Sequence, residues 1–141
     1  MENKETYTKL FKQIEKLKNS EDPKRKYEYI LWLGKKLKVP DNTIFIPENK
    51  VQGCVSEVFV KASFQEGKLY WEGYSDALIT KGLLAFLISG MDKLTPKEVV
   101  SINKKFIEDT GLKASLTPSR SNGFLNILLK MQSQANHFLS E

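Results

Sequence analysis

Two stretches near the N-terminus place hydrophobic residues at helical spacing. The first stretch predicts an amphipathic helix over residues 6–18, and its apolar positions are Tyr7, Leu10, Phe11, Ile14 and Leu17. Asp22-Pro23 then combines a helix-capping residue with a proline at the first helical position. The second helix that it opens carries an apolar stripe of Tyr27, Ile30, Leu31 and Leu37. Val39-Pro40-Asp41-Asn42 ends this helix, and residues 40–50 are predicted to form an ordered loop.

The middle of the chain changes to a strand-like pattern. Residues 51–64 and 68–74 are rich in Val, Phe, Tyr and Trp, which favour β-structure. Gln65-Glu66-Gly67-Lys68 between them is typical of a hairpin turn. Lys50-Val51-Gln52 is a candidate for a short strand of its own before Gly53. The pattern therefore predicts a small antiparallel sheet.

Three more helices are expected after the strands. Residues 77–89 are so apolar that the helix must be central to the core, with Ser75 or Asp76 as its cap and Gly90 at its C-terminal end. Thr95-Pro96-Lys97-Glu98 is a capping box that opens a helix to about residue 109. The last helix follows residues 116–120 and buries Phe124, Leu125, Leu128, Leu129 and Met131. The fold class is α+β, as one domain over residues 1–141 with helices from both ends packed on the sheet.

The charge distribution narrows the classes of function. The net charge is +5, and residues 1–50 hold 12 basic and 8 acidic residues, interleaved rather than clustered. This spacing favours a solvated face over a nucleic-acid footprint, although a basic nucleic-acid- or protein-binding module with a structural cysteine stays open as an alternative. No apolar run approaches the length of a membrane span and the start does not resemble a signal peptide, so we expect a cytoplasmic protein without a membrane partner.

Cys54 is the only cysteine, so within one chain it forms no disulfide and no cysteine-only metal cluster. It is either a small buried hydrophobe or a single reactive thiol, whose pKa nearby positive charge or helix N-terminal amides would lower. Two predicted helix starts could supply such amides, one at Ser75-Asp76 and one at residues 117–119. Arg120, beside the second start, could supply the positive charge. His137 is the only histidine and is expected to face solvent, so no metal site and no Cys–His pair is predicted.

Three segments carry a family resemblance, in order along the chain. Gly53-Cys54-Val55-Ser56-Glu57-Val58 resembles a GCxSxV motif. Gly73-Tyr74-Ser75-Asp76-Ala77, followed by Lys81-Gly82-Leu83-Leu84-Ala85, resembles a GxSDA…KGLxA motif, and residues 116–123 resemble LxPSRxxG. Together they are similar to the SufE family of sulfur-acceptor proteins, with its CsdE-like branch, over about residues 50–135.

The resemblance implies a SufE/NifU-like α+β fold with about three antiparallel strands. It also implies that Cys54 accepts persulfide sulfur from a SufS- or CsdA-type cysteine desulfurase, stimulates that enzyme, and passes the sulfur to an Fe–S scaffold complex or another acceptor. Gly53, Ser56, Asp76 and Arg120 are expected to support the cysteine loop or the partner interface. No cofactor is expected in this chain, because pyridoxal phosphate belongs to the desulfurase; a homodimer stays open, and no nucleic-acid partner is expected.

Two other functions remain as alternatives at this point. An Fe–S scaffold needs several ligating cysteines, and this chain has one. An enzyme with Cys54 as nucleophile lacks a convincing base.

Glu57 departs from the amide found in many relatives of the family. A nearby carboxylate would raise the pKa of the thiol, but as a strand residue Glu57 is expected to face solvent. A wall of Val51, Phe59 or Trp71 is hypothesised to shelter a carried persulfide.

Overall fold

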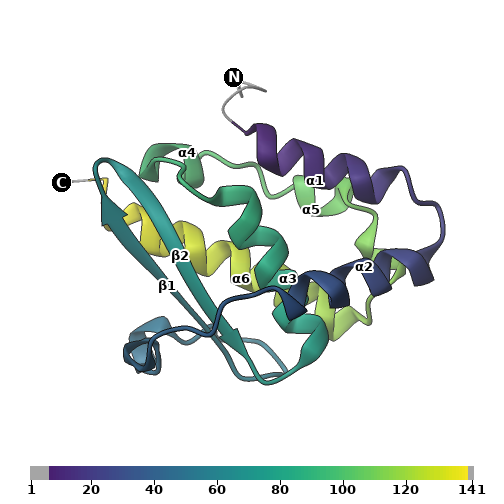
Figure 1. The fold of residues 1–141 in the computed structure, drawn as a ribbon, viewed down its shortest axis with the longest axis horizontal. Helices are drawn as coiled ribbons and strands as arrows, with labels where there is room; N and C mark the ends of the chain where they lie inside the picture. The colour runs from purple at the N-terminus through teal and green to yellow at the C-terminus, as the bar shows by residue number, and fades with distance from the viewer. Residues whose placement is uncertain (1–6, 140–141) are drawn as a thin grey trace.

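The computed structural model describes residues 7–139 and has an α+β fold, as predicted (Figure 1). In chain order its elements are α1 (Thr8–Lys18), α2 (Pro23–Lys35), the 3₁₀ turns η1 (Asn42–Ile44) and η2 (Pro47–Asn49), β1 (Val58–Gln65), β2 (Lys68–Ser75), α3 (Leu78–Met91), α4 (Pro96–Val100), α5 (Phe106–Asp109), the 3₁₀ turn η3 (Leu112–Ala114) and α6 (Pro118–Asn136). Within residues 7–139, no helix combines the length and the apolar character that crossing a bilayer requires.

The sheet is one antiparallel hairpin of β1 and β2. Its two turn residues, Glu66 and Gly67, have φ of 51° and 80°, and positive values at both positions suit the right-handed twist of a hairpin. The sheet has two strands, one fewer than the resemblance implies. The third is reduced to a single bridge between Lys50 and Phe59, and β1 begins at Val58 because the preceding residues form turns.

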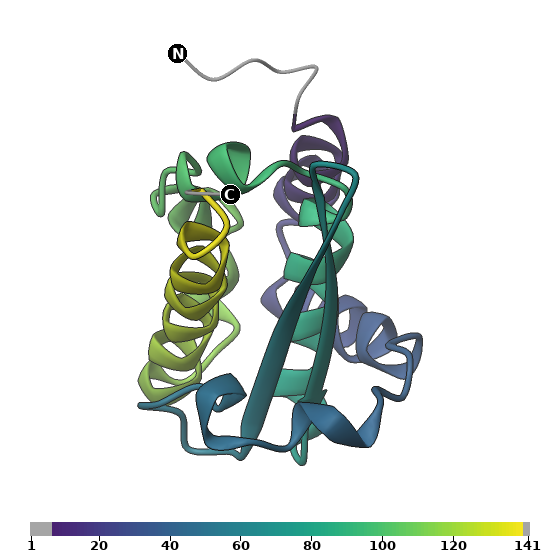
Figure 2. The ribbon, with the colours of Figure 1, turned by 90° about the vertical axis from the view of Figure 1, so that its left-hand side faces the viewer.

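Helix α3 is the centre of the molecule, as its apolar sequence predicts. In Figure 2, α3 lies behind the hairpin. Helix α6 is on one side of this pair, and α1 and α2 are on the other side. Two glycines let α2 and α3 approach closely, since a Cβ on Gly34 would lie 2.9 Å from the backbone nitrogen of Gly82. On the other side, Phe86 of α3 and Phe124 of α6 are fully buried and meet edge to face at 6.0 Å.

Three local expectations about the helices are wrong. Gly90 does not end α3 but lies inside it, buried against Leu10 of α1, where its missing side chain allows the contact. Leu129 is 42% exposed rather than buried, because α6 turns that position away from the core. The single helix predicted to reach about residue 109 is divided into two short helices, α4 and α5. Between them, the Gln132 side chain of α6 donates to the carbonyls of Val99 and Ile102.

Candidate functional site

Cys54 lies in the loop that joins η2 to β1, and α6 covers its side chain. The thiol is half-buried and its Sγ donates to the backbone carbonyl of Gly123, 3.8 Å away. A Cβ at position 123 would lie 3.6 Å from Sγ, in ordinary van der Waals contact. Helix α6 therefore supplies both the apolar cover and the hydrogen-bond acceptor for the resting thiol.

Gly53 is fixed in the loop by Asn126 of α6. Its φ is +78°, a conformation that glycine adopts without steric cost. The Asn126 side chain donates to the Gly53 carbonyl at 3.1 Å, and a Cβ on Gly53 would lie 2.6 Å from the donating nitrogen. The backbone conformation therefore requires glycine beside the cysteine, whereas the close approach involves only the end of the flexible Asn126 side chain.

Arg120 joins the loop to two helices. Its guanidinium donates to the hydroxyls of Ser56 in the loop and of Thr80 on α3, the latter at 2.8 Å. These two hydroxyls lie 3.4 Å apart, and Thr80 is only 3% exposed. At its own backbone, Arg120 donates to the Thr117 hydroxyl that caps α6. The cluster pins the loop after Cys54 against the start of α3 and the start of α6.

Asp76 anchors the end of the same loop. Its carboxylate accepts the backbone N–H of Glu57 at 3.0 Å, while its own N–H donates to the Glu57 carbonyl. The prediction that Asp76 or Ser75 caps α3 is wrong, because the N-cap residue is Ala77, which makes no side-chain capping bond. The carboxylate instead holds the point where the loop becomes β1. The Glu57 side chain is exposed, as predicted.

The electrostatic surroundings of Cys54 favour the protonated thiol. Partial burial raises the pKa of the Cys54 thiol, and the positive charge of Arg120 opposes that rise to a smaller extent. The folded-state pKa is therefore above that of the unfolded chain. Burial of the neutral thiol stabilises the fold below the unfolded pKa, and this contribution is lost as the pH rises through the folded pKa.

We expect the alkylation of Cys54 by iodoacetamide to speed up with rising pH through a midpoint above that of an ordinary cysteine. An Arg120→Met variant should move this midpoint higher, because it removes the charge that favours the thiolate. The rate of alkylation against pH, followed by mass spectrometry, measures both midpoints. Arg25→Met is the matched control, since Arg25 is exposed on α2 and should leave the profile unchanged. A lower or unchanged midpoint in Arg120→Met would contradict the assignment.

Other residues considered from the sequence lie away from the thiol. His137 is exposed at the C-terminal end of α6, as predicted. Of the hypothesised wall of Val51, Phe59 or Trp71, the Phe59 ring packs against Phe45 and Tyr74, and Trp71 lines a cavity that does not include Cys54; Val51 is buried, and its role as a shelter stays a hypothesis. Within residues 7–139, no three His, Cys, Asp or Glu side chains come together in a way that could hold a metal ion.

Two contacting residues, Thr80 and Asn126, were not identified from the sequence. Each is a polar residue inside an apolar helical stretch, residues 77–89 and 124–131 respectively, and this interruption is the signal that could have marked them. Two exposed apolar residues flank the loop: Val55, next to the cysteine, is 71% exposed, and Leu78, at the start of α3, is 70% exposed. Apolar side chains this exposed beside a sheltered thiol suit a protein partner.

Sequence comparison with known proteins finds SufE proteins in both the family match and the individual relatives. The family model described as the SufE Fe-S metabolism associated domain matches residues 12–135. An uncharacterised SufE-like protein of Synechocystis is 50% identical over 129 residues, 92% of this chain and 81% of that protein. The cysteine desulfuration protein SufE of Plasmodium falciparum is 34% identical over 115 residues, 78% of this chain and 46% of that protein.

Two further similarities concern length and fold. SufE-like protein 1 of Arabidopsis thaliana, named as chloroplastic/mitochondrial, is 41% identical over 92% of this chain, which spans 35% of that relative's length. The solution structure of a hypothetical protein from Thermus thermophilus superposes with a TM-score of 0.82, at 24% identity, over 94% of this chain and 97% of the other. At that identity the superposition supports the fold alone.

Proposed function

The chain belongs to the SufE family, which places it in Fe–S metabolism, and from that premise we propose that Cys54 is a carrier of sulfane sulfur. It accepts the sulfur from a pyridoxal-phosphate-dependent cysteine desulfurase and delivers it toward Fe–S cluster assembly, which stimulates turnover of the desulfurase. Pyridoxal phosphate belongs to the desulfurase, and the carrier needs no cofactor of its own. The relatives named as cysteine desulfuration proteins support this assignment.

The transfer step is a thiol exchange at sulfur. The Cys54 thiol loses its proton, and its sulfur attacks the outer sulfur of a persulfide on the desulfurase. A new S–S bond forms on Cys54 while the donor S–S bond breaks, and the donor cysteine leaves as a thiolate that takes up a proton. No net oxidation occurs, so one thiol in each protein is sufficient.

The observation that carries the proposal is the support built around a single thiol. Four side chains hold the loop at Gly53, Ser56 and Glu57. They are Asp76, just after β2, Thr80 of α3, and Arg120 and Asn126 of α6. A cysteine that served only as a small hydrophobe would need no such set of polar contacts to its neighbours. At rest the neutral form of the thiol is favoured and the side chain is half-buried, so the desulfurase draws the loop away from Gly123 to expose the sulfur fully for transfer.

Intact-mass spectrometry tests this function directly. The protein is mixed with a SufS-type desulfurase, pyridoxal phosphate and cysteine, and we expect a gain of one or more sulfur atoms that a thiol reductant removes. Alkylating Cys54 beforehand should prevent the gain. The rate of sulfide release by the desulfurase should rise with the concentration of the carrier. No mass gain and no stimulation, with several desulfurases of this class, would overturn the proposal.

A surface variant separates docking from chemistry in the same assay. We propose that the desulfurase contacts Val55 and Leu78, so Val55→Asp should slow the mass gain. Val39→Asp is the matched control, because Val39 is 91% exposed and lies in the segment after α2. Equal rates for the two variants would exclude this docking surface while leaving the role of Cys54 intact.

A further inference from the structure

The outer edge of β1 is closed by other parts of the chain. The Val51 N–H donates to the Val58 carbonyl at 2.8 Å. Further along, the side-chain amide of Gln134 on α6 accepts the Ala62 N–H at 3.0 Å and donates to the Val60 carbonyl at 2.7 Å. Strand β1 therefore has hydrogen-bond partners on both sides.

The outer edge of β2 is closed at only one end. The N–H of Leu69 donates to the Leu94 carbonyl, and the Lys93 N–H donates to the Leu69 carbonyl. Because alternate residues of a strand present their backbone groups to the same side, Trp71 and Gly73 present theirs to this same edge. In the part of the chain that the structure describes, these N–H and C=O groups have no hydrogen-bond partner.

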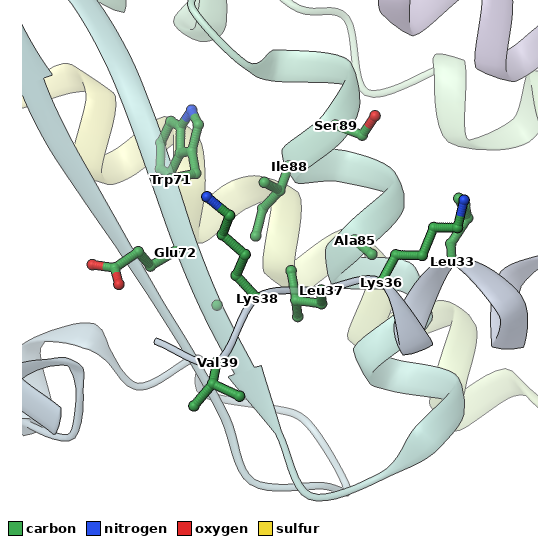
Figure 3. Close-up of a pocket in the computed structure, with 11 residues that line it drawn as sticks. Leu33, Lys36, Leu37, Lys38, Val39, Trp71, Glu72, Ala85, Ile88 and Ser89 are labelled. Atoms are coloured by element: carbon green, nitrogen blue, oxygen red, sulfur yellow. The ribbon is translucent and has the colours of Figure 1, made fainter. Parts of the chain in front are cut away.

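A cavity of about 360 Å³ lies against this open part of the edge (Figure 3). Its apolar lining includes Leu37, Ala85 and Ile88, from the segment after α2 and from α3. The Trp71 side chain, 8% exposed, also lines it, and the buried indole N–H has no partner among the described residues. The volume is in the range of small-ligand sites, and such sites combine apolar walls with a few polar groups.

The charge at this cavity is positive. Figure 3 shows the Lys38 side chain extending toward Trp71, and no carboxylate in residues 7–139 forms an ion pair with Lys38. Lys36 is engaged elsewhere, with its ammonium 3.8 Å from the centre of the Trp32 ring. Glu72 also lines the cavity, but its carboxylate accepts the Asp41 N–H and is directed away from Lys38 in Figure 3.

We propose that this cavity binds the C-terminal end of a peptide that finishes in an apolar residue. The peptide extends the sheet at Trp71 and Gly73, its last side chain enters the space between Leu37 and Ile88, and its carboxylate lies at Lys38. Strand addition and capture of a terminal carboxylate are both known modes of peptide recognition. Cys54 does not line this cavity, so the site is distinct from the proposed sulfur-transfer site and does not depend on it.

Titration of the ¹⁵N-labelled protein with N-acetyl-leucine tests the site by NMR. We expect saturable shifts of the backbone amides of Trp71 and Gly73 and of the Trp71 indole N–H. N-acetyl-leucinamide, which lacks the carboxylate, should bind at least tenfold more weakly. Octanoate, which lacks the amide, should leave the two backbone amides unshifted.

A charge variant completes the test. Lys38→Gln should weaken binding of N-acetyl-leucine about tenfold and leave binding of the amide unchanged. Lys68→Gln is the control, because Lys68 is exposed beside the hairpin turn. Ala85→Leu should abolish binding by filling the cavity. Absence of saturable shifts, equal affinity for acid and amide, or no effect of Lys38→Gln would each overturn the proposal.

Discussion

A Cys54→Ser variant is expected to fold normally and to lose sulfur acceptance and stimulation of the desulfurase completely. The serine hydroxyl is slightly smaller than the thiol, and in the half-buried site a small shift of the loop would let it donate to the Gly123 carbonyl. It cannot form a persulfide, because the transfer step requires a thiolate that makes a new S–S bond. Intact mass after incubation with the desulfurase, together with the rate of sulfide release, measures both losses.

The control for this variant is its stability. The urea midpoint of Cys54→Ser should lie close to that of the unmodified protein, which separates loss of chemistry from loss of fold. Arg120→Met, with the cysteine retained, should accept sulfur slowly rather than not at all. Sulfur found on the serine variant in a form that a reductant removes would show that Cys54 is not the carrier.

Gly82→Ala is expected to destabilise the protein by about 2 kcal/mol, although helix propensity alone predicts a gain of about 1 kcal/mol. Gly82 lies inside α3, in its second turn, where alanine is normally the better residue. A Cβ there would lie 2.7 Å from the carbonyl carbon of Ile30, a backbone atom of α2 that cannot rotate away. Overpacking against backbone therefore outweighs the propensity gain.

Urea denaturation measures this effect as a lower midpoint at unchanged slope. Lys81→Ala is the matched control, because it is the neighbouring position on α3 and should change the stability by no more than about 0.5 kcal/mol. An increase in stability of Gly82→Ala would mean that α2 and α3 are packed less closely than the structure shows. The glycine in the Lys81-Gly82-Leu83 segment thus has a packing role that is independent of the proposed sulfur transfer.

The sequence predicts those parts of the fold that depend on local chemistry. The Asp22 and Thr95 caps, the prolines that follow them and the hairpin turn at Glu66-Gly67 are all observed. The errors arise where a distant segment decides the outcome. Gly90 stays helical because α1 packs on it, and the helix after Thr95 breaks where Gln132 takes up its carbonyls.

The same distinction holds for the candidate site. Short motifs mark Cys54, Ser56, Asp76 and Arg120, and the structure brings these residues to one loop. Their partners are separated from the loop by up to 73 residues, as for Asn126 and Gly53. Single-sequence patterns carry no information on such pairs, so the partners of the loop and its cover by α6 appear only in the folded chain.

The two hydrogen bonds of Gln134 also restrict how the protein can move. Because one side chain joins α6 to both Val60 and Ala62, the helix cannot slide along the hairpin without breaking both bonds. A shift of one helical turn, about 5.4 Å, is far beyond the reach of either hydrogen bond. We therefore expect α6 to stay in place during the proposed transfer, with any displacement of Cys54 confined to the short segment between η2 and β1.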